Sequence, residues 1–235
     1  MRKSYKVILF VIIVLIIILL PIYLCFNMFN NQKSQNKFSP SVSYDTENFK
    51  YLDFCSTSEC VLSPLEYQSL KTSSNDNNII KEVKKINSNI QDYYDKSANS
   101  QGSCASFTNV IHPLAGMVSV YAYEDEDFLN ITLNGSDFDL CSQTNSNLQF
   151  SSFYYDKSLK EEITESNFKR KNNINDEKVI NAIEEYLVGF NSQSGTNYSY
   201  DRNYSYHVFK DADGTMMVYF ITSDGRMSLT FSLTN

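Results

Sequence analysis

The sequence predicts an α+β fold in which an N-terminal transmembrane helix precedes antiparallel sheet with packed amphipathic helices. Three observations predict it: one long apolar run near the start, two stretches with apolar residues every three or four positions, and several segments rich in β-branched and aromatic residues. A helix that lies across an antiparallel sheet buries one face of each element, which is the arrangement typical of this fold class.

The apolar run extends from Val7 to Phe26 without a charged residue and follows a short basic segment, residues 1–6. At about 1.5 Å per residue such a helix is roughly 30 Å long, which matches the hydrocarbon thickness of a bilayer. No small residues typical of a cleavage site follow the run, so we expect an anchor that is retained. A cleaved signal peptide and a lipoprotein modified at Cys25 are the alternatives.

The charges around this run predict its orientation. Arg2, Lys3 and Lys6 precede the run, and no basic residue follows it immediately. The positive-inside rule then places the N-terminus in the cytoplasm and the residues after Phe26 outside it, in a periplasmic or extracellular space. The lipid bilayer is therefore the expected partner of residues 7–26. Residues 27–43 are mostly Asn, Gln, Ser and Lys, and we expect them to form a flexible polar stalk.

Four cysteines follow the stalk, an even number that predicts two disulfide bonds in an oxidising compartment. We expect Cys55 to pair with Cys60, because this pair closes a short loop. We expect Cys104 to pair with Cys141, because this pair joins the ends of a predicted strand meander. The other pairings, a reactive thiol and a metal site stay open as alternatives.

Residues 44–155 are expected to form a first module, a helix followed by a β-meander. Asn and Asp residues that can cap a helix precede a run of apolar residues at helical intervals: Ile79, Ile80, Val83, Ile86 and Ile90. Strands are predicted over residues 107–112, 117–123, 128–133 and about 148–155. Asn134 with Gly135 predicts a two-residue hairpin turn.

Residues 156–235 are expected to form a second module of the same order. Ser158 with Glu161 predicts a capping box that opens a short helix. A longer helix is predicted from near Asn175 by its apolar periodicity: Val179, Ile180, Ile183, Leu187 and Phe190. Strands are predicted over residues 204–210, 215–222 and 226–233, with turns at Asp213–Gly214 and Asp224–Gly225.

The two modules align with each other along the sequence. The helix residues repeat after 100 positions, and the strand residues from Gly116 to Leu133 repeat after 98 positions as Gly214 to Phe231. A duplicated module and a chance similarity of two helix-plus-hairpin segments both explain this repeat. The order resembles the architecture of cystatin-like and pilin-like domains, and a likeness of architecture does not give function.

The charge balance limits the partners. After residue 6 the chain has 17 basic and 27 acidic residues, so this part carries about −10 at neutral pH. Nucleic acids and anionic lipid headgroups need basic patches, so we expect neither as a partner of the domain. Another envelope protein or an exported protein is the expected partner.

No sequence motif predicts an enzyme. The chain has no G-x-S-x-G, phosphate loop, dinucleotide fingerprint or H-E-x-x-H. Cys104 lies near His112, but we expect this cysteine in a disulfide, and we expect His207 to be a packing or edge residue of a strand. The acidic turn from Glu124 to Asp127 does not match a full calcium loop, and neither does the pair Asp211 and Asp213. We therefore predict no catalytic residue, no cofactor and no metal site.

A repeated N-Y-S-Y motif supplies a candidate contact surface: Tyr198, Tyr200, Tyr204 and Tyr206. In an extended chain Tyr198 and Tyr200 share one face, and Tyr204 and Tyr206 form another such row. Tyrosine is enriched in protein interfaces because its ring combines a large apolar area with a hydroxyl. The alternative is that one row packs on the second helix.

These observations lead to three functional hypotheses. The first is a single-pass membrane protein that presents a disulfide-stabilised extracytoplasmic α+β domain for protein binding or for assembly of an envelope or secretion complex. The second is a membrane-tethered inhibitor or immunity-type protein whose acidic domain caps a basic or active-site surface of an exported toxin or protease. The third is a tethered hydrolase whose site the sequence does not show.

Overall fold

The structure, a computed structural model, describes residues 38–54, 64–102, 110–202 and 205–233. One compact unit extends from Pro40 to Asn235. The predicted anchor over residues 7–26 and the stalk up to residue 37 lie outside the described residues. Within the described ranges, no helix is long and apolar enough to cross a bilayer.

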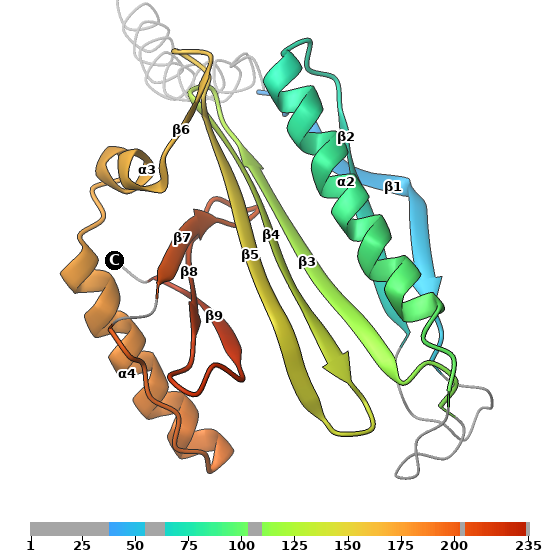
Figure 1. Cartoon of the computed structure of the whole chain (residues 1–235). Coiled ribbons are helices and arrows are strands. Elements are labelled where there is room, and N and C mark those ends of the chain that lie inside the picture. Colours follow the sequence, from blue (N-terminus) through green and yellow to red (C-terminus); the bar gives the residue numbers. More distant parts are fainter. Residues whose placement is uncertain (1–37, 55–63, 103–109, 203–204, 234–235) are drawn as a thin grey trace, which may run out of the picture. The chain divides into compact units, whose positions relative to one another are not determined.

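The described part of the chain is α+β, with three antiparallel sheets and three helices (Figure 1). The chain first forms a two-stranded sheet, β1 (Val42–Leu52) and β2 (Leu65–Thr72), and then helix α2 (Asn77–Ala98). The central sheet has the strands β3 (Leu114–Glu124), β4 (Phe128–Asp139), β5 (Thr144–Asp156) and β6 (Glu161–Ile163) in that order. Two helices follow, α3 (Glu165–Lys171) and α4 (Asp176–Ser194). The last sheet consists of β7 (Tyr206–Lys210), β8 (Met216–Ile221) and β9 (Ser228–Ser232).

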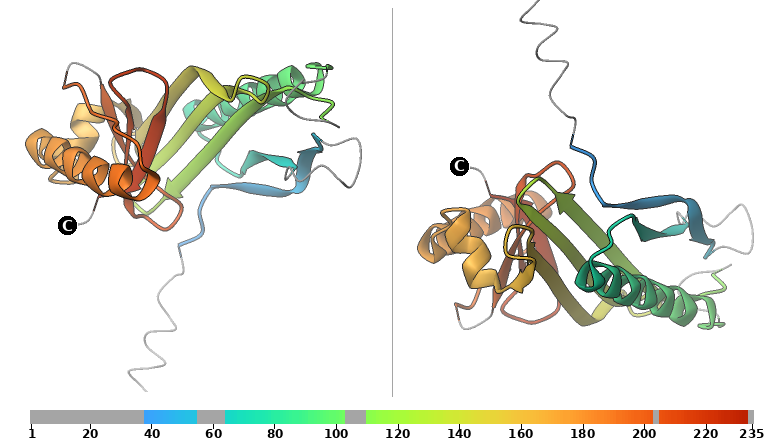
Figure 2. Two further views of the ribbon diagram at one scale, coloured as in Figure 1. Left: turned by 90° about the horizontal axis from the view of Figure 1, so that it is seen from below. Right: turned by 90° about the horizontal axis from the view of Figure 1, so that it is seen from above.

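The two faces of the central sheet pack on different layers. Figures 1 and 2 show α2 with the β1–β2 sheet on one side of the long strands, and the β7–β9 sheet with α4 on the other. Alternate residues of β4 divide between these layers, as the period of two in a strand requires. Leu129 packs in the core beneath α2, and Phe128 packs in the core shared with α4.

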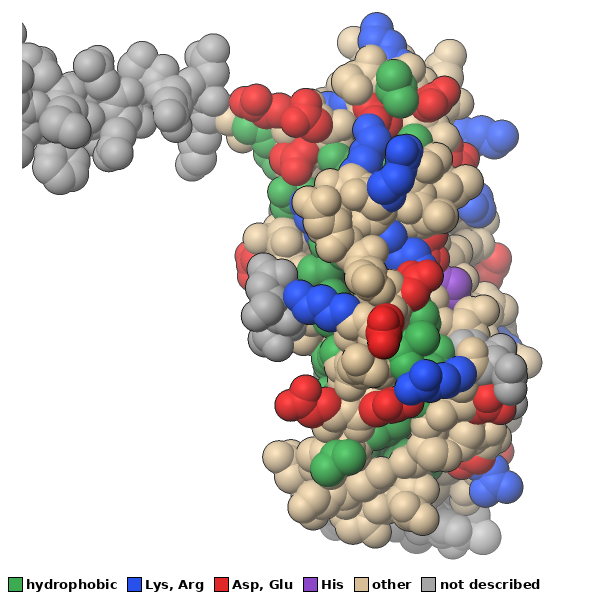
Figure 3. Space-filling model, turned by 90° about the vertical axis from the view of Figure 1, so that its left-hand side faces the viewer, with side chains coloured by type: hydrophobic (Ala, Val, Ile, Leu, Met, Phe, Trp, Pro, Cys, Tyr) green, Lys and Arg blue, Asp and Glu red, His purple; other side chains and the backbone are tan. Residues whose placement is uncertain are grey.

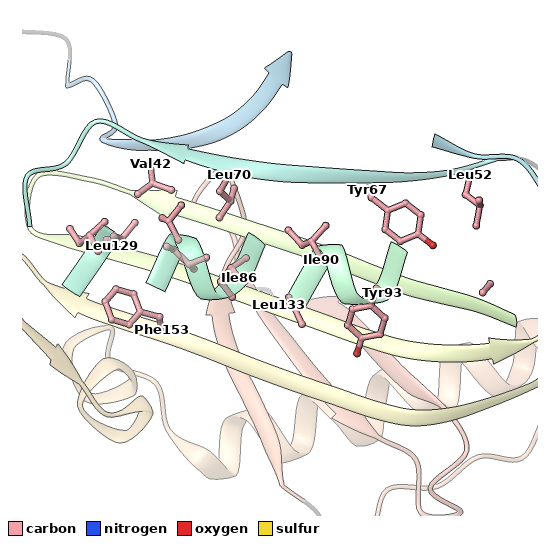
Figure 4. Close-up of a cluster of buried hydrophobic side chains, with 14 of the residues drawn as sticks. Val42, Leu52, Tyr67, Leu70, Ile86, Ile90, Tyr93, Leu129, Leu133 and Phe153 are labelled. Atoms are coloured by element: carbon pink, nitrogen blue, oxygen red, sulfur yellow. The ribbon is translucent and has the colours of Figure 1, made fainter. Parts of the chain in front are cut away.

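The first core forms where the predicted helix lies on the sheet. Figure 4 shows side chains of α2, among them Ile86 and Ile90, facing Leu129 and Leu133 of β4. All four are at most 4 % exposed. Burial of an aliphatic side chain of this size contributes about 1.5–3 kcal/mol, so this contact accounts for much of the stability of α2. The prediction of the helix over this segment is confirmed, and Asp76 caps its first turn by accepting a hydrogen bond from the Asn78 amide at 2.8 Å.

The second core also matches a predicted helix. Helix α4 begins after its N-cap Asn175, as predicted, and buries Val179, Ile183 and Leu187. These residues pack with Val218 and other residues of the last sheet. The predictions of three terminal strands and of their two turns are confirmed, with Gly214 and Gly225 at φ angles of 83° and 68°. Glycine adopts these positive angles without the steric cost that a side chain brings.

Helix α2 lies close to the central sheet at two glycines. A Cβ atom on Gly116 would lie 2.6 Å from the Tyr93 carbonyl oxygen, and one on Gly135 would lie 2.3 Å from the Tyr93 hydroxyl oxygen. A hydrogen bond fixes the same contact, because the Gly116 amide donates to Ser97 Oγ at 2.6 Å. Tyr67 of β2 adds a bond to the same strand, since its hydroxyl donates to the Gly116 carbonyl at 2.9 Å. The absent side chains therefore let the last turns of α2 lie directly on β3 and β4.

The predicted hairpin turn at Asn134–Gly135 is wrong. Both residues lie inside β4 and pair with β3 on one side and β5 on the other. The chain reverses instead after Asp139, whose Oδ1 accepts a hydrogen bond from the Cys141 amide at 2.8 Å. Glycine is needed at position 135 because the Tyr93 side chain lies against it, and not because the chain turns there.

The strands predicted over 117–123, 128–133 and 148–155 lie within β3, β4 and β5. In the strand predicted over 107–112, only Val110 forms an isolated bridge, and residues 107–109 lie outside the described residues.

Two strands precede α2 that the sequence did not predict. Strand β1 begins at Val42, inside the segment predicted to be stalk, and Val42 is only 4 % exposed. Charged residues within β1, Asp45 and Glu47 among them, interrupt the apolar alternation that would have predicted a strand. Its register with β2 also shifts between Tyr44 and Phe49.

A buried carboxylate holds the start of β1. Glu124, at the end of β3, has a side chain that is 2 % exposed. It accepts hydrogen bonds from the Ser41 amide at 2.6 Å and the Val42 amide at 2.9 Å, and it pairs with the Lys157 ammonium at 3.0 Å. We call these contacts the Glu124 clamp. They fix the point at which the chain enters the domain.

The capping box predicted at Ser158 is also wrong. Ser158 lies in a turn, where its amide and hydroxyl donate to Asp156 Oδ1 at 2.9 and 2.6 Å. Strand β6 follows, and the helix α3 begins only after Thr164, whose hydroxyl accepts a hydrogen bond from the Asn167 amide at 3.2 Å. The carboxylate of Asp156 therefore stabilises a turn at Ser158, and Thr164 is the residue that caps the helix.

The Asp156 carboxylate predicts a loss of stability in acid. Hydrogen bonds from Lys171 and, with a smaller effect, from Ser158 hold the pKa of Asp156 well below its ordinary value. Its stabilising effect is complete above the unfolded-state pKa of about 3.9 and is lost as the pH falls toward the lower folded pKa. Asp156→Asn is expected to reduce the free energy of unfolding at pH 7 and to flatten its decrease below about pH 4. Urea unfolding at a series of pH values checks this. An unchanged acid slope in this variant would contradict it.

The two halves share an order of elements but not the details of the sequence repeat. Each has a helix packed on an antiparallel meander. The strands β3 to β5 have 11 to 13 residues, whereas β7 to β9 have five or six. The glycines that align 98 positions apart also differ, because Gly116 lies within β3 and Gly214 lies in a turn. The structure therefore leaves both the duplication and the chance similarity open.

Candidate functional site

The C-terminal half of helix α2 presents polar side chains beside its buried stripe. Asn89, Asp92, Tyr93 and Lys96 are spaced by three, one and three positions, which places them on one helix face. They line a pocket of about 210 Å³ together with Asp137 of β4 and with Asn147 and Gln149 of β5. We call this the α2 pocket.

Asp137 supplies the buried carboxylate of the α2 pocket and follows a series of apolar residues on one face of β4. Leu129, Ile131 and Leu133 alternate along β4 on the face toward α2, and the same period of two continues to Gly135 and Asp137. Asp137 is buried, with a side chain 2 % exposed, and pairs with the Lys96 ammonium. A charged group at this depth is costly unless it is paired and hydrogen-bonded.

A β-bulge places the second partner of Asp137. The register of β4 with β5 shifts between Gly135 and Asp137, so that β5 has one extra residue there. Asn147 adopts a φ angle of 51° at this point, a left-handed conformation that Asn accepts more readily than most residues. Its amide Nδ2 donates to Asp137 Oδ2 at 2.5 Å.

Both partners of Asp137 bind the same oxygen atom. Lys96 and Asn147 contact Oδ2, whereas the buried Oδ1 has no hydrogen-bond partner within the described ranges. A buried carboxylate oxygen without a donor costs about 1–3 kcal/mol or more, and native proteins leave few such atoms. This unsatisfied acceptor distinguishes the α2 pocket from a merely solvated hollow.

Tyr93 forms the wall between the α2 pocket and the first core. Its ring lies against Gly135, and its hydroxyl donates to Gln149 Oε1 at 3.2 Å. Burial, followed by the charge of Asp137, raises the pKa of Tyr93 to about 12. The hydroxyl therefore stays protonated at neutral pH and serves as a donor.

The pocket carries the chemistry of recognition. Its lining residues offer two carboxylates, one ammonium, one phenol and three amides. Asp92 and Asp137 outweigh Lys96, so the pocket has a formal charge of −1 at neutral pH. Such groups bind donors and cations by hydrogen bonds and charge.

The tyrosines predicted as a contact surface lie on the other side of the domain, against the second core. The Tyr198 ring lies 6.2 Å from that of Phe190, and the Tyr200 ring lies 5.7 Å from that of Phe220. The Tyr206 hydroxyl donates to Asp176, and burial followed by this carboxylate raises the pKa of Tyr206. Tyr204 lies outside the described residues.

All three described tyrosines are half-buried, which fits the packing alternative. Figure 3 looks onto the face that carries α3 and α4, where acidic and basic side chains are interspersed with hydrophobic ones. The use of these tyrosines as a contact surface stays a prediction.

Among the predicted disulfide residues, Cys141 is the one that lies within the described ranges. It takes part in a disulfide bond. No pair is seen between described residues, because Cys55, Cys60 and Cys104 lie outside them. The two predicted pairings therefore stay predictions.

His207 lies in β7, as the sequence predicts, and bridges two elements. Its ring stacks on Phe150 at 4.2 Å, and its Nδ1 lies 2.8 Å from Glu165 Oε2. The other Glu165 oxygen accepts a hydrogen bond from the Val208 amide at 2.9 Å, so the pair holds α3 against β7. His112 is half-buried, and its buried Nδ1 atom has no hydrogen-bond partner among the described residues.

The acidic residues that could have bound calcium have structural partners. Glu124 forms the clamp, and Asp125 Oδ1 accepts from the amides of Asp127 and Phe128 at 3.0 and 2.8 Å. Asp211 Oδ1 likewise accepts from the Asp213 and Thr215 amides. Within the described part of the chain, no group of three His, Cys, Asp or Glu side chains is arranged to hold a metal ion.

Larger cavities exist elsewhere in the domain. One of about 340 Å³ is mostly apolar and includes Phe54, Leu65 and Met117. Another of about 380 Å³ adjoins the Asp156 turn and includes Lys171 and Lys210. Small-molecule sites have volumes from about 300 Å³, so cavity size leaves the tethered hydrolase open.

The α2 pocket was missed because its residues are distant in the sequence. Asn89, Asp92 and Lys96 recur at helical intervals, so the sequence could have predicted a polar face on this helix. The turn wrongly predicted at Asn134–Gly135 ended the strand before Asp137. The sequence therefore did not predict that Asp137 lies beside the polar face of α2. In the comparisons with known proteins, no protein-family model and no curated protein matches this chain.

Proposed function

We propose that this chain is a single-pass membrane protein that presents its α+β domain outside the cytoplasm as a protein-binding module, for instance in an envelope or secretion complex. The uncharged run from Val7 to Phe26 and the basic residues before it support the anchor and its orientation. The rigid attachment of the chain at the Glu124 clamp supports a domain held at a defined point.

The single observation that carries the binding function is the α2 pocket. It offers a 98 % buried carboxylate with one unsatisfied oxygen, in a hollow that opens beside the exposed Asp92. A donor group that reaches that buried oxygen on binding would satisfy it and recover its desolvation cost. Binding is therefore the property that this arrangement favours.

Site-specific cross-linking in intact cells tests the module. A photoreactive amino acid in place of Asn89, at the pocket, is expected to capture one protein in a fixed ratio. The same amino acid in place of the exposed Lys178 on α4 serves as the matched control and is expected to capture none. Equal capture from both positions, or none from Asn89, would count against the α2 pocket as a partner site.

A second candidate function is a tethered inhibitor or immunity-type protein. The acidic balance of 27 Asp and Glu residues against 17 basic residues beyond the N-terminal segment favours a basic target surface. Tight one-to-one binding that abolishes the activity of a single exported enzyme would support this function over assembly.

A further inference from the structure

We infer that the α2 pocket binds the guanidinium group of an arginine side chain on the protein partner. This inference rests on the proposed function and names the chemistry of the partner at the same site. Three properties of the pocket point to it: its charge, its unsatisfied acceptors and its size.

The charge of the pocket favours a cationic group. Lys96 is engaged with Asp137 Oδ2, so it neutralises one of the two carboxylates. Asp92 is exposed at the pocket, and its carboxylate has no hydrogen-bond or ion-pair partner within the described ranges. An added cation would lie between the two carboxylates and bring the pocket to neutrality. The surplus of acidic residues in the whole domain would also steer a basic partner toward it.

The acceptors of the pocket exceed its donors. Asp137 Oδ1 has no partner, and neither the Asp92 carboxylate nor the Asn147 Oδ1 oxygen accepts a hydrogen bond from a described residue. Guanidinium is planar and carries five N–H donors and no acceptor, so it can bind more than one oxygen of the exposed residues Asp92 and Asn147 at once. An ammonium group has three donors at one point and is more strongly hydrated, so lysine is a poorer match.

The size of the pocket favours one side chain over a larger ligand. Its volume of about 210 Å³ lies below the roughly 300 Å³ at which small-molecule sites begin. It opens at the surface beside Asp92, so a side chain projecting from a partner can reach it. The buried Tyr93 ring would form the apolar wall along which the guanidinium lies.

Peptide binding to the full-length chain in detergent micelles tests the inference. The probes are the capped tripeptide Gly-Arg-Gly and its citrulline analogue, which keeps the shape and lacks the charge. We expect the arginine peptide to bind at least about tenfold more tightly, since a hydrogen bond to a charged group exceeds a neutral one by about 1.4 kcal/mol. The capped Gly-Lys-Gly peptide is expected to bind with intermediate affinity.

Two matched variants locate the binding site. Asp92→Asn removes one exposed carboxylate of the pocket and is expected to reduce the affinity for the arginine peptide about tenfold, while the affinity for the citrulline peptide stays the same. Asp95→Asn changes an exposed carboxylate of the same helix that does not line the pocket, and is expected to leave both affinities unchanged. Equal affinity for the two peptides, or equal loss in both variants, would overturn the inference.

The outcome separates this inference from the proposed function. Specific cross-linking from position 89 without an arginine preference would leave the binding module standing and overturn the guanidinium assignment. An arginine preference without a cross-linked protein in cells would support the pocket chemistry and count against the partner function. The two experiments therefore fail independently.

Discussion

Substitution of Gly116 by alanine is expected to lower the free energy of unfolding by about 3 kcal/mol, at the upper end of the usual cost of overpacking a core. The added methyl group would lie 2.6 Å from the carbonyl oxygen of Tyr93. This oxygen belongs to the backbone of α2, so a rotamer change cannot remove the clash. Movement of the helix would also break the hydrogen bond that the Gly116 amide donates to Ser97 Oγ.

Gly189→Ala provides the matched control for this substitution. Gly189 lies inside α4, and a Cβ atom there would meet no atom within 4 Å. The same chemical change is expected to raise the free energy of unfolding by about 0.5–1 kcal/mol, because alanine favours the helix. Urea unfolding of both variants, followed by circular dichroism, measures the two effects. A Gly116→Ala variant as stable as the native chain would show that α2 does not lie this close to β3.

Removal of the clamp carboxylate by Glu124→Ala is expected to lower the free energy of unfolding by about 2–4 kcal/mol. The change would leave the amides of Ser41 and Val42 without their acceptor and the Lys157 ammonium without its 3.0 Å ion pair. Lys157 is one-quarter exposed, so water compensates part of that loss.

Hydrogen exchange locates the effect of the clamp. In the Glu124→Ala variant the Val42 amide is expected to exchange faster than in the native chain, while the amides in the middle of β4 keep their relative protection. Glu126→Ala is the control, because Glu126 is exposed in the same turn and accepts no hydrogen bond from a described residue. Unchanged exchange at Val42 would show that Glu124 does not hold the start of β1.

The elements that the sequence predicted well are those with a local cause. Helices α2 and α4 follow from apolar residues at intervals of three and four, and each begins at a capping residue beside that pattern. The turns at Gly214 and Gly225 follow from glycine, which accepts the positive φ angles found there. Neighbouring residues alone are enough to specify such features.

The elements that the sequence missed have causes far along the chain. Gly135 resembles a turn residue until Tyr93, 42 positions earlier, occupies the space above it. The start of β1 is held by Glu124, more than 80 positions later. The α2 pocket needs Lys96 and Asp137, which lie 41 positions apart and meet only when α2 crosses the sheet. The periodicity of neighbouring residues does not predict such long-range contacts.

The Glu124 clamp also has a mechanical consequence. It lies at one end of β3, whereas the α2 pocket adjoins Gly116, which pairs with Asp137 near the other end. The eight positions between Glu124 and Gly116 correspond to about 27 Å of strand. The proposed partner and the proposed membrane anchor would therefore pull along the strands, at right angles to the hydrogen bonds between β3 and β4. Under such shear all the hydrogen bonds between the two strands bear the force together. A hairpin pulled apart from one end loses its bonds one after another, so this domain would resist a higher tension.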